Sequence, residues 1–182
     1  MKLHVLIYDG FVSFEIMLAT YLLKTKGDMV TVGLSTDPVT SYEGFKLIPS
    51  VSIPELRADD IQLLLIPGGD IQDIQSHSAL NTLINRLDQR NAYIATICSA
   101  SQLLDMERLS AEQKKQLLTN PAGVTIEGNL ITAKANKYVD FAIELGKVMD
   151  IYRDKEDLEE TIQYFKLFKE KFHFFRTETT EF

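Results

Sequence analysis

Cysteine, histidine and tryptophan are the scarce residues of this chain. Its 182 residues include one cysteine, three histidines and no tryptophan. A single cysteine allows no disulfide within the chain, which fits the reducing cytoplasm where we expect the protein to be located. The histidines and the cysteine also lack the close spacing of metal ligands, so we expect neither a metal nor another cofactor.

Long apolar runs and clusters of basic residues are missing as well. No run approaches the roughly 18 apolar residues that cross a membrane, and the apolar segment at residues 3–8 is too short for a signal peptide. The formal net charge of −7, without a basic cluster, argues against nucleic acid and anionic membranes as partners. What remains is the composition of an ordinary soluble globular protein, 45% apolar and 25% charged, with a length that fits one domain.

Apolar runs alternate with amphipathic segments in a βαβ order. Strands that are apolar throughout are typical of sheets covered by helices on both faces. The pattern predicts an α/β fold with a doubly wound, mostly parallel sheet. The expected strands lie at residues 3–8, 29–34, 62–66 and 92–97, with hairpins within 36–54 and over 124–132. The expected helices lie at 13–27, 71–90, 137–149 and 155–172, with a short one starting at residue 110.

Apolar side chains in the first helix and in the C-terminal segment predict which surfaces are buried. Ser13 is a candidate cap for the first helix. The stripe expected to face the core there consists of Phe14, Met17, Leu18, Tyr21 and Leu22. Six of the ten phenylalanines lie after residue 164, so the C-terminal segment should pack either on its own domain or against another subunit.

The single cysteine, Cys98, lies where an apolar strand gives way to small, helix-compatible residues. Unpaired backbone N–H groups and the dipole at a helix start favour the thiolate, which is the form that acts as a nucleophile or redox centre. The alternative is a buried cysteine that serves only as a small apolar residue.

Two further loops should reach the same edge of the sheet as Cys98. Ligands of open α/β sheets bind beyond the carboxyl ends of the strands, where Glu15 and the pair Gly68–Gly69 are also expected. Glycines let the backbone approach a substrate, and their N–H groups can hold an oxyanion. Taken alone, the glycine pair is more typical of a tight strand-to-helix turn, and Glu15 of a solvated residue near a helix start.

Together these segments resemble the DJ-1/PfpI (ThiJ/PfpI) family, within the class I glutamine amidotransferase-like superfamily. The matching stretches are residues 5–11 with Glu15, 64–69, 94–98 and 128–133, in the family's order. The resemblance implies a flavodoxin-like three-layer sandwich that forms one domain over residues 1–182, with a C-terminal helix at about 155–172. The family's habit of pairing, together with that aromatic helix, predicts a homodimer.

The resemblance also assigns roles to four residues. Cys98 would be the nucleophile, Glu15 the acid that hydrogen-bonds its sulfur, and Gly69 and Ser99 the donors of backbone N–H groups to an oxyanion. Because a carboxylate repels a neighbouring thiolate, the pair should keep one proton near neutral pH and titrate as a unit. A protonated Glu15 would then stabilise the Cys98 thiolate, and we expect a thiol of low pKa.

Histidine is missing where many family members have it. Protease-like members place a histidine directly after the cysteine, where this chain has Ser99, and glyoxalase-like members supply one from a later loop. Residues 98–132 contain none, and His4, His77 and His173 are expected to be structural. We therefore expect feeble peptidase and glyoxalase activity.

Three classes of function fit these residues. The preferred one is a small-molecule hydrolase, hydratase or lyase that uses Cys98 and Glu15 without a histidine, as isonitrile hydratase-like family members do. The second is a redox or stress-response protein in which an oxidant converts Cys98 to a sulfenic or sulfinic acid. The third is a non-catalytic binding module.

Overall fold

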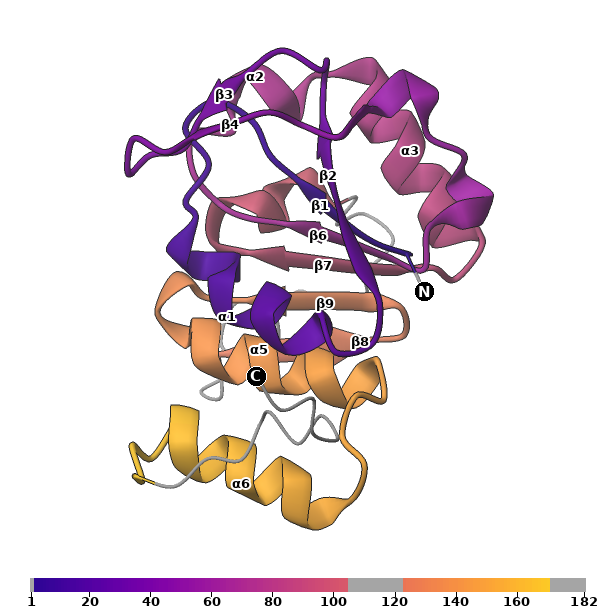
Figure 1. Cartoon of the computed structure of the whole chain (residues 1–182). Helices are drawn as coiled ribbons and strands as arrows, with labels where there is room; N and C mark the ends of the chain where they lie inside the picture. The colour runs from indigo at the N-terminus through magenta and orange to yellow at the C-terminus, as the bar shows by residue number, and fades with distance from the viewer. Residues whose placement is uncertain (1, 105–122, 171–182) are drawn as a thin grey trace, which may run out of the picture.

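A seven-stranded sheet forms the centre of the structure, a computed structural model that describes residues 2–104 and 123–170. The strand order is β5-β2-β1-β6-β7-β9-β8, and every pairing is parallel except that of β8 with β9 (Figure 1). The strands are β1 (Lys2–Leu6), β2 (Asp28–Gly33), β5 (Val51–Ser52), β6 (Leu63–Ile66), β7 (Tyr93–Ile97), β8 (Val124–Glu127) and β9 (Leu130–Ala133). The predicted mostly parallel α/β sheet is confirmed.

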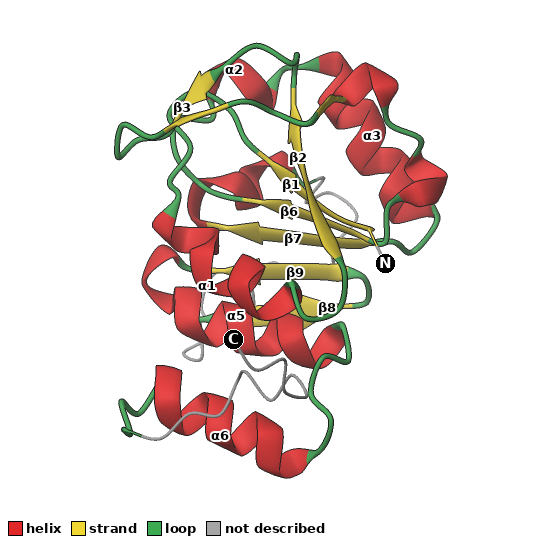
Figure 2. Cartoon of the chain, in the orientation of Figure 1, coloured by secondary structure: helices red, strands yellow, loops and turns green. Residues whose placement is uncertain are grey.

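Helices cover both faces of this sheet (Figure 2). Helix α1 (Phe14–Leu23) packs against α5 (Tyr138–Val148), and α3 (Ser78–Gln89) packs against β7. The crossover from β1 to β2 and that from β6 to β7 run in opposite directions along the sheet. Because both are right-handed, α1 and α3 lie on opposite faces, as the doubly wound prediction requires. Helix α6 (Lys155–Phe165) packs on the outside of α5.

The central strands are buried on both faces, which explains why their sequences are almost entirely apolar. All four residues of β6 are buried, as are the last four of β1 and of β7. Each fully buried Leu or Ile side chain contributes roughly 1.5–3 kcal/mol relative to exposure. This rigid centre fixes the strand ends from which the functional loops leave. None of the helices in the described ranges is long and apolar enough to cross a membrane.

The predicted buried stripe of the first helix is wrong at three of its five positions. Leu22 is buried as predicted, and Leu18 is partly buried and packs against the core. Phe14 and Met17 are each 49% exposed and Tyr21 is 39% exposed. The residues that face the sheet and α5 are Glu15, Ile16, Ala19, Leu22 and Leu23. Helix α1 is apolar on nearly all sides, so the spacing of its apolar residues could not identify the buried face.

Other boundaries also differ from the expected ones. The helix expected over 71–90 is two helices, α2 (Gln72–Gln75) and α3, which are separated at His77. The expected last helix ends at Phe165 rather than at residue 172. Ser13 precedes α1 but makes no side-chain capping bond, contrary to expectation. The small hairpin within 36–54 is present as β3 (Val39–Thr40) and β4 (Lys46–Leu47), and the hairpin of β8 and β9 is confirmed. The helix expected from residue 110 lies outside the described residues.

Candidate active site

The strand β7 ends in a strained turn that carries the single cysteine. Cys98 has φ +59°, a left-handed conformation that costs a residue with a side chain roughly 1–2 kcal/mol. It begins a 3₁₀-helix, η3 (Cys98–Leu103), and its thiol is exposed. A nucleophile on a strained strand-to-helix turn, presented above the sheet, is the arrangement of nucleophile elbows. The α-helix expected after Cys98 is instead this short 3₁₀ segment, whose dipole supports a thiolate less strongly.

The loops that follow β1 and β6 meet beside this turn, because these strands are neighbours of β7 in the sheet. The backbone N–H of Val12 donates to the Gly68 carbonyl at 2.9 Å, and the Asp70 N–H donates to the Gly10 carbonyl at 3.2 Å. Phe11 and Gly69 form a bridge between the two loops. The edge of the sheet therefore brings the predicted carboxyl group, glycine pair and thiol together.

Glu15 lies buried beneath the elbow, in the first turn of α1. Its side chain belongs to a residue that is only 2% exposed, and it hydrogen-bonds the Cys98 sulfur. The Glu15 Oε2 accepts a hydrogen bond from the Gly68 N–H at 2.8 Å. Gly68 has no room for a side chain, because a Cβ there would lie 2.6 Å from the Cβ of Cys98 and 2.7 Å from Glu15 Oε2.

Electrostatics in this pair favour a single shared proton. Burial raises the pKa of Glu15, and its hydrogen bonds from Gly68 and Cys98 oppose that rise only in part. Desolvation and then the charge of Glu15 raise the pKa of the Cys98 thiol, and its hydrogen bond to the Glu15 carboxylate raises it further. Hydrogen bonds from Ser99 lower it. Burial is the largest cause of both rises, and the charge of Glu15 adds to the rise at Cys98. The pKa of the Cys98 thiol is thus raised, whereas its place at a helix start predicts a lowered one.

Ser99 and Gly69, the predicted oxyanion donors, are joined to each other. The Gly69 N–H donates to Ser99 Oγ at 3.0 Å, and the Ser99 hydroxyl donates back to the Gly69 carbonyl at 2.9 Å. The backbone N–H of Ser99 hydrogen-bonds the Cys98 sulfur. A substrate oxygen that is to reach the Gly69 N–H must displace the Ser99 hydroxyl.

Two residues near the pair were missed by the sequence argument. Tyr8 is buried at the end of the β1 run and donates its hydroxyl to the Pro67 carbonyl at 2.9 Å. Burial, then the charges of Glu15 and Cys98, raise the pKa of Tyr8. Glu43, from the turn between β3 and β4, reaches the start of α1. No motif marks Glu43, since its position depends on a hairpin 30 residues away from the helix that it contacts.

The histidines in the described segments have structural positions outside the Cys98–Glu15 pair. His4 is buried in β1, and burial lowers its pKa. His77 caps α3 by accepting a hydrogen bond from the Leu80 N–H at 3.4 Å. His173 lies outside the described residues. Within residues 2–104 and 123–170, no three His, Cys, Asp or Glu residues are grouped as a metal site would require.

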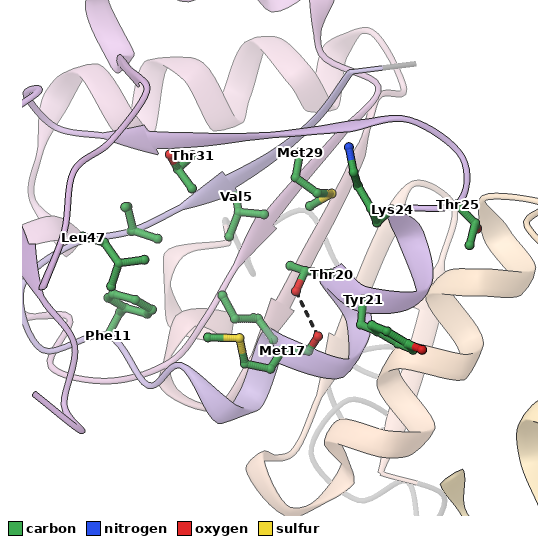
Figure 3. Close-up of a pocket in the computed structure, with 12 residues that line it drawn as sticks. Val5, Phe11, Met17, Thr20, Tyr21, Lys24, Thr25, Met29, Thr31 and Leu47 are labelled. Atoms are coloured by element: carbon green, nitrogen blue, oxygen red, sulfur yellow. Dashed lines mark hydrogen bonds between the residues drawn. The ribbon is translucent and has the colours of Figure 1, made fainter. Parts of the chain in front are cut away.

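A cavity of about 720 Å³ lies beside α1 rather than at Cys98. Figure 3 shows its apolar walls, which include Met17 on α1 and Val5, Met29 and Leu47 on strands β1, β2 and β4. Cys98 and Glu15 are not among the residues that line it. The cavity is therefore a separate apolar surface and not the reaction site.

Comparison with known proteins agrees with this architecture. A family model described as DJ-1/PfpI family matches residues 1–147. A curated relative, named as the uncharacterized protease YoaZ of Bacillus subtilis (strain 168), is 24% identical over 141 residues, which are 68% of this chain and 67% of that protein.

Solved structures show the same fold at low sequence identity. A DJ-1 superfamily protein from Agrobacterium tumefaciens has a TM-score of 0.76 and 21% identity, covering 93% of this chain and 100% of its own. The DJ-1beta protein of Drosophila melanogaster has a TM-score of 0.72 and 21% identity, with 89% and 95% coverage. A thiJ/pfpI family protein from Bacillus anthracis has a TM-score of 0.73 and 20% identity, with 92% and 91% coverage.

Proposed function

The chain belongs to the DJ-1/PfpI family, and on that premise we propose that it is a hydrolase, hydratase or lyase for a small molecule, with Cys98 as nucleophile and Glu15 as acid and base. One observation carries the proposal: a strained, exposed cysteine at φ +59° is hydrogen-bonded to a carboxyl group that is only 2% exposed. Strain of this kind is kept at sites where function requires it.

The reactive state of the pair has its proton on Glu15 and its charge on Cys98. We propose this distribution of the proton because Glu15 is more deeply buried than Cys98, so a charge costs more on the carboxyl group. The thiolate forms a bond to an electrophilic carbon, a π electron pair of the substrate moves away from that carbon, and the Glu15 proton neutralises the resulting anion. Addition of water then releases the product, with the sulfur as leaving group, and Glu15 regains its proton.

Backbone N–H groups at the site would support an oxygen that gains charge. Gly69 and Ser99 are proposed as these donors, with the Ser99 hydroxyl yielding its place at Gly69 to the substrate. Preorganised donors of this kind matter most in acyl transfer, whereas attack on an isonitrile carbon requires only the thiolate and a proton donor. The histidine-free pair therefore suits hydration better than peptide hydrolysis.

A substrate panel tests this function. Peptides, methylglyoxal and isonitriles are offered to the wild type and to Cys98→Ser. We expect turnover that is lost in Cys98→Ser, with isonitriles favoured over peptides and methylglyoxal, because no histidine is placed to protonate a leaving amine. Robust peptidase turnover that depends on Cys98 would overturn the histidine-free reading.

A redox function is the second candidate, and the exposure of the Cys98 thiol favours it. An accessible thiolate is the form that peroxide oxidises to sulfenic and then sulfinic acid. Mass spectrometry of Cys98 after treatment with mild peroxide separates the two functions. A signalling cysteine is oxidised at low peroxide concentration, whereas a catalytic cysteine is protected from oxidation by added substrate. An unreactive Cys98 would instead indicate a binding module. One cysteine without a disulfide fits a cytoplasmic location for any of these.

The exposed side of α1 supports a homodimer. Phe14, Met17 and Tyr21 are exposed apolar residues of α1. Met17 and Tyr21 also line the 720 Å³ cavity (Figure 3). A two-fold axis presents the same surface of both copies to each other. Because these exposed side chains are continuous with the cavity, pairing of two copies across this surface would bury apolar area on both.

A further inference from the structure

The start of α1, the helix that carries Glu15, is capped by a residue from a distant hairpin. The Glu43 carboxylate accepts hydrogen bonds from the Ser13 N–H at 3.0 and 3.1 Å and from the Phe14 N–H at 3.2 Å. Ser13 supplies no side-chain cap of its own. Glu43 thus satisfies backbone donors at the positive end of the helix, which a carboxylate stabilises through charge as well as hydrogen bonding.

The hairpin that carries Glu43 is itself fastened to the loop before α1. The Tyr42 N–H donates to the Phe11 carbonyl at 2.7 Å, and the Gly10 N–H donates to the Thr40 carbonyl at 2.8 Å. The Thr40 N–H donates to Asp9 Oδ1 at 2.7 Å. The loop from β1 to α1 is therefore held between this hairpin on one side and Gly68–Gly69 on the other.

We propose that Glu43 is a positioning residue for the reaction, because it fixes the first turn of α1 and thereby Glu15 against Cys98, while its negative charge favours the protonated form of Glu15. The inference rests on the proposed Cys98–Glu15 chemistry. Glu43 acts through Glu15 and touches neither the thiol nor a reacting atom.

The negative charge of Glu43 changes the pKa of Glu15 in the direction that this role requires. Burial is the largest cause that raises the pKa of Glu15, and the Glu43 charge adds to it. Glu43 is an exposed residue. Desolvation at the helix start raises its pKa, but hydrogen bonds from backbone N–H groups, first that of Ser13, and from the Ser41 hydroxyl lower it to about 2. Glu43 therefore stays charged wherever Cys98 is reactive.

The groups that face Glu15 from the packed elements are few in the described part of the chain. Cys98 faces it from the start of η3, Tyr8 from the end of β1 and Glu43 from the hairpin. Removal of the Glu43 charge should lower the pKa of Glu15, so the shared proton moves toward Cys98 and less thiolate is present near neutral pH.

The test is the rate of Cys98 alkylation by iodoacetamide between about pH 5 and 10 in Glu43→Gln, Glu43→Asp and the wild type. Glutamine keeps an acceptor oxygen but loses the charge, whereas aspartate keeps the charge. We expect Glu43→Gln to slow alkylation at pH 7 about two- to fivefold and to displace the pH profile. A rate change of this size corresponds to the loss of one charge at a helix terminus. Glu43→Asp should keep most of the wild-type alkylation rate.

Glu55→Gln is the matched control. Glu55 likewise accepts a backbone N–H, that of Ser52 at 2.8 Å, but it caps the 3₁₀-helix η1 (Ile53–Glu55) beside the edge strand β5. Its alkylation profile should equal that of the wild type. A wild-type profile in Glu43→Gln, while Glu15→Gln slows the reaction, would overturn the role of Glu43 and leave the proposed function standing. No effect of Glu15→Gln would overturn both.

Discussion

At the residue scale, the site depends on a thiol and a carboxyl group that share one proton. Their environments differ, since Cys98 is exposed on a strained turn while Glu15 is buried. Moving a charge into a buried position is costly, and the proposed function therefore places the proton on Glu15 and the charge on the sulfur. In the proposed mechanism, the buried acid takes the role that a histidine has in the protease-like members of the family.

Gly68 fixes the distance between these two groups, and its replacement by alanine tests this. The added Cβ would lie 2.6 Å from the Cβ of Cys98 and 2.7 Å from Glu15 Oε2, so the pair must separate. We expect Gly68→Ala to slow Cys98 alkylation at pH 7 by about tenfold or more, as loss of one hydrogen bond to a charged group would.

Gly128→Ala serves as the control for Gly68→Ala. Gly128 lies in the turn between β8 and β9, with φ +59° and open space around it. Alanine there should lower the free energy of unfolding by about 1–2 kcal/mol without a change in alkylation rate. If both variants alkylate at the wild-type rate when folded, Gly68 has no part in placing the pair.

At the element scale, the order and type of most elements could be predicted, but the orientation of α1 could not. Strands such as β6 are apolar throughout and short, and sequences of this kind are typical of a covered parallel sheet. The elbow could be predicted because the change of pattern at Cys98 is local. Helix α1 carries apolar residues on nearly all sides, and only packing against α5 decides that Ile16 faces inward while Met17 faces outward.

Long-range contacts explain what else the sequence could not show. The cap of α1 comes from Glu43 rather than from Ser13, because the hairpin carries a carboxylate to the free N–H groups. The bond between Gly69 and Ser99 joins residues 30 positions apart, and nothing in either segment indicates it. The Cys98–Glu15 pair itself was predicted from the family resemblance, since the separate motifs are individually common.

At the scale of the whole molecule, the apolar side of α1 leads to a prediction about assembly. Light scattering at micromolar concentration should give about twice the 20.7 kDa mass of the chain. Met17→Glu should shift the protein to the mass of one chain, because a charge would be buried in an apolar interface.

The control for assembly is Ile126→Glu, which changes a similarly exposed apolar residue, 42% exposed, on the edge strand β8. This variant should keep the mass of the wild type. A wild-type protein that has the mass of a single chain would contradict the dimer, and a dimer that survives Met17→Glu would place the interface elsewhere.

The central claim, that Cys98 reacts as a thiolate kept by a protonated Glu15, is tested most directly by the alkylation rate of Cys98 against pH in the wild type and in Glu15→Gln. The account predicts a wild-type reaction that is already fast below the pH at which ordinary thiols ionise, about 8.5. It also predicts a slower reaction of Glu15→Gln near neutral pH, because an amide is a weaker donor to the thiolate than a carboxylic acid. A wild-type rate that rises only near pH 8.5, and that Glu15→Gln leaves unchanged, would contradict the account.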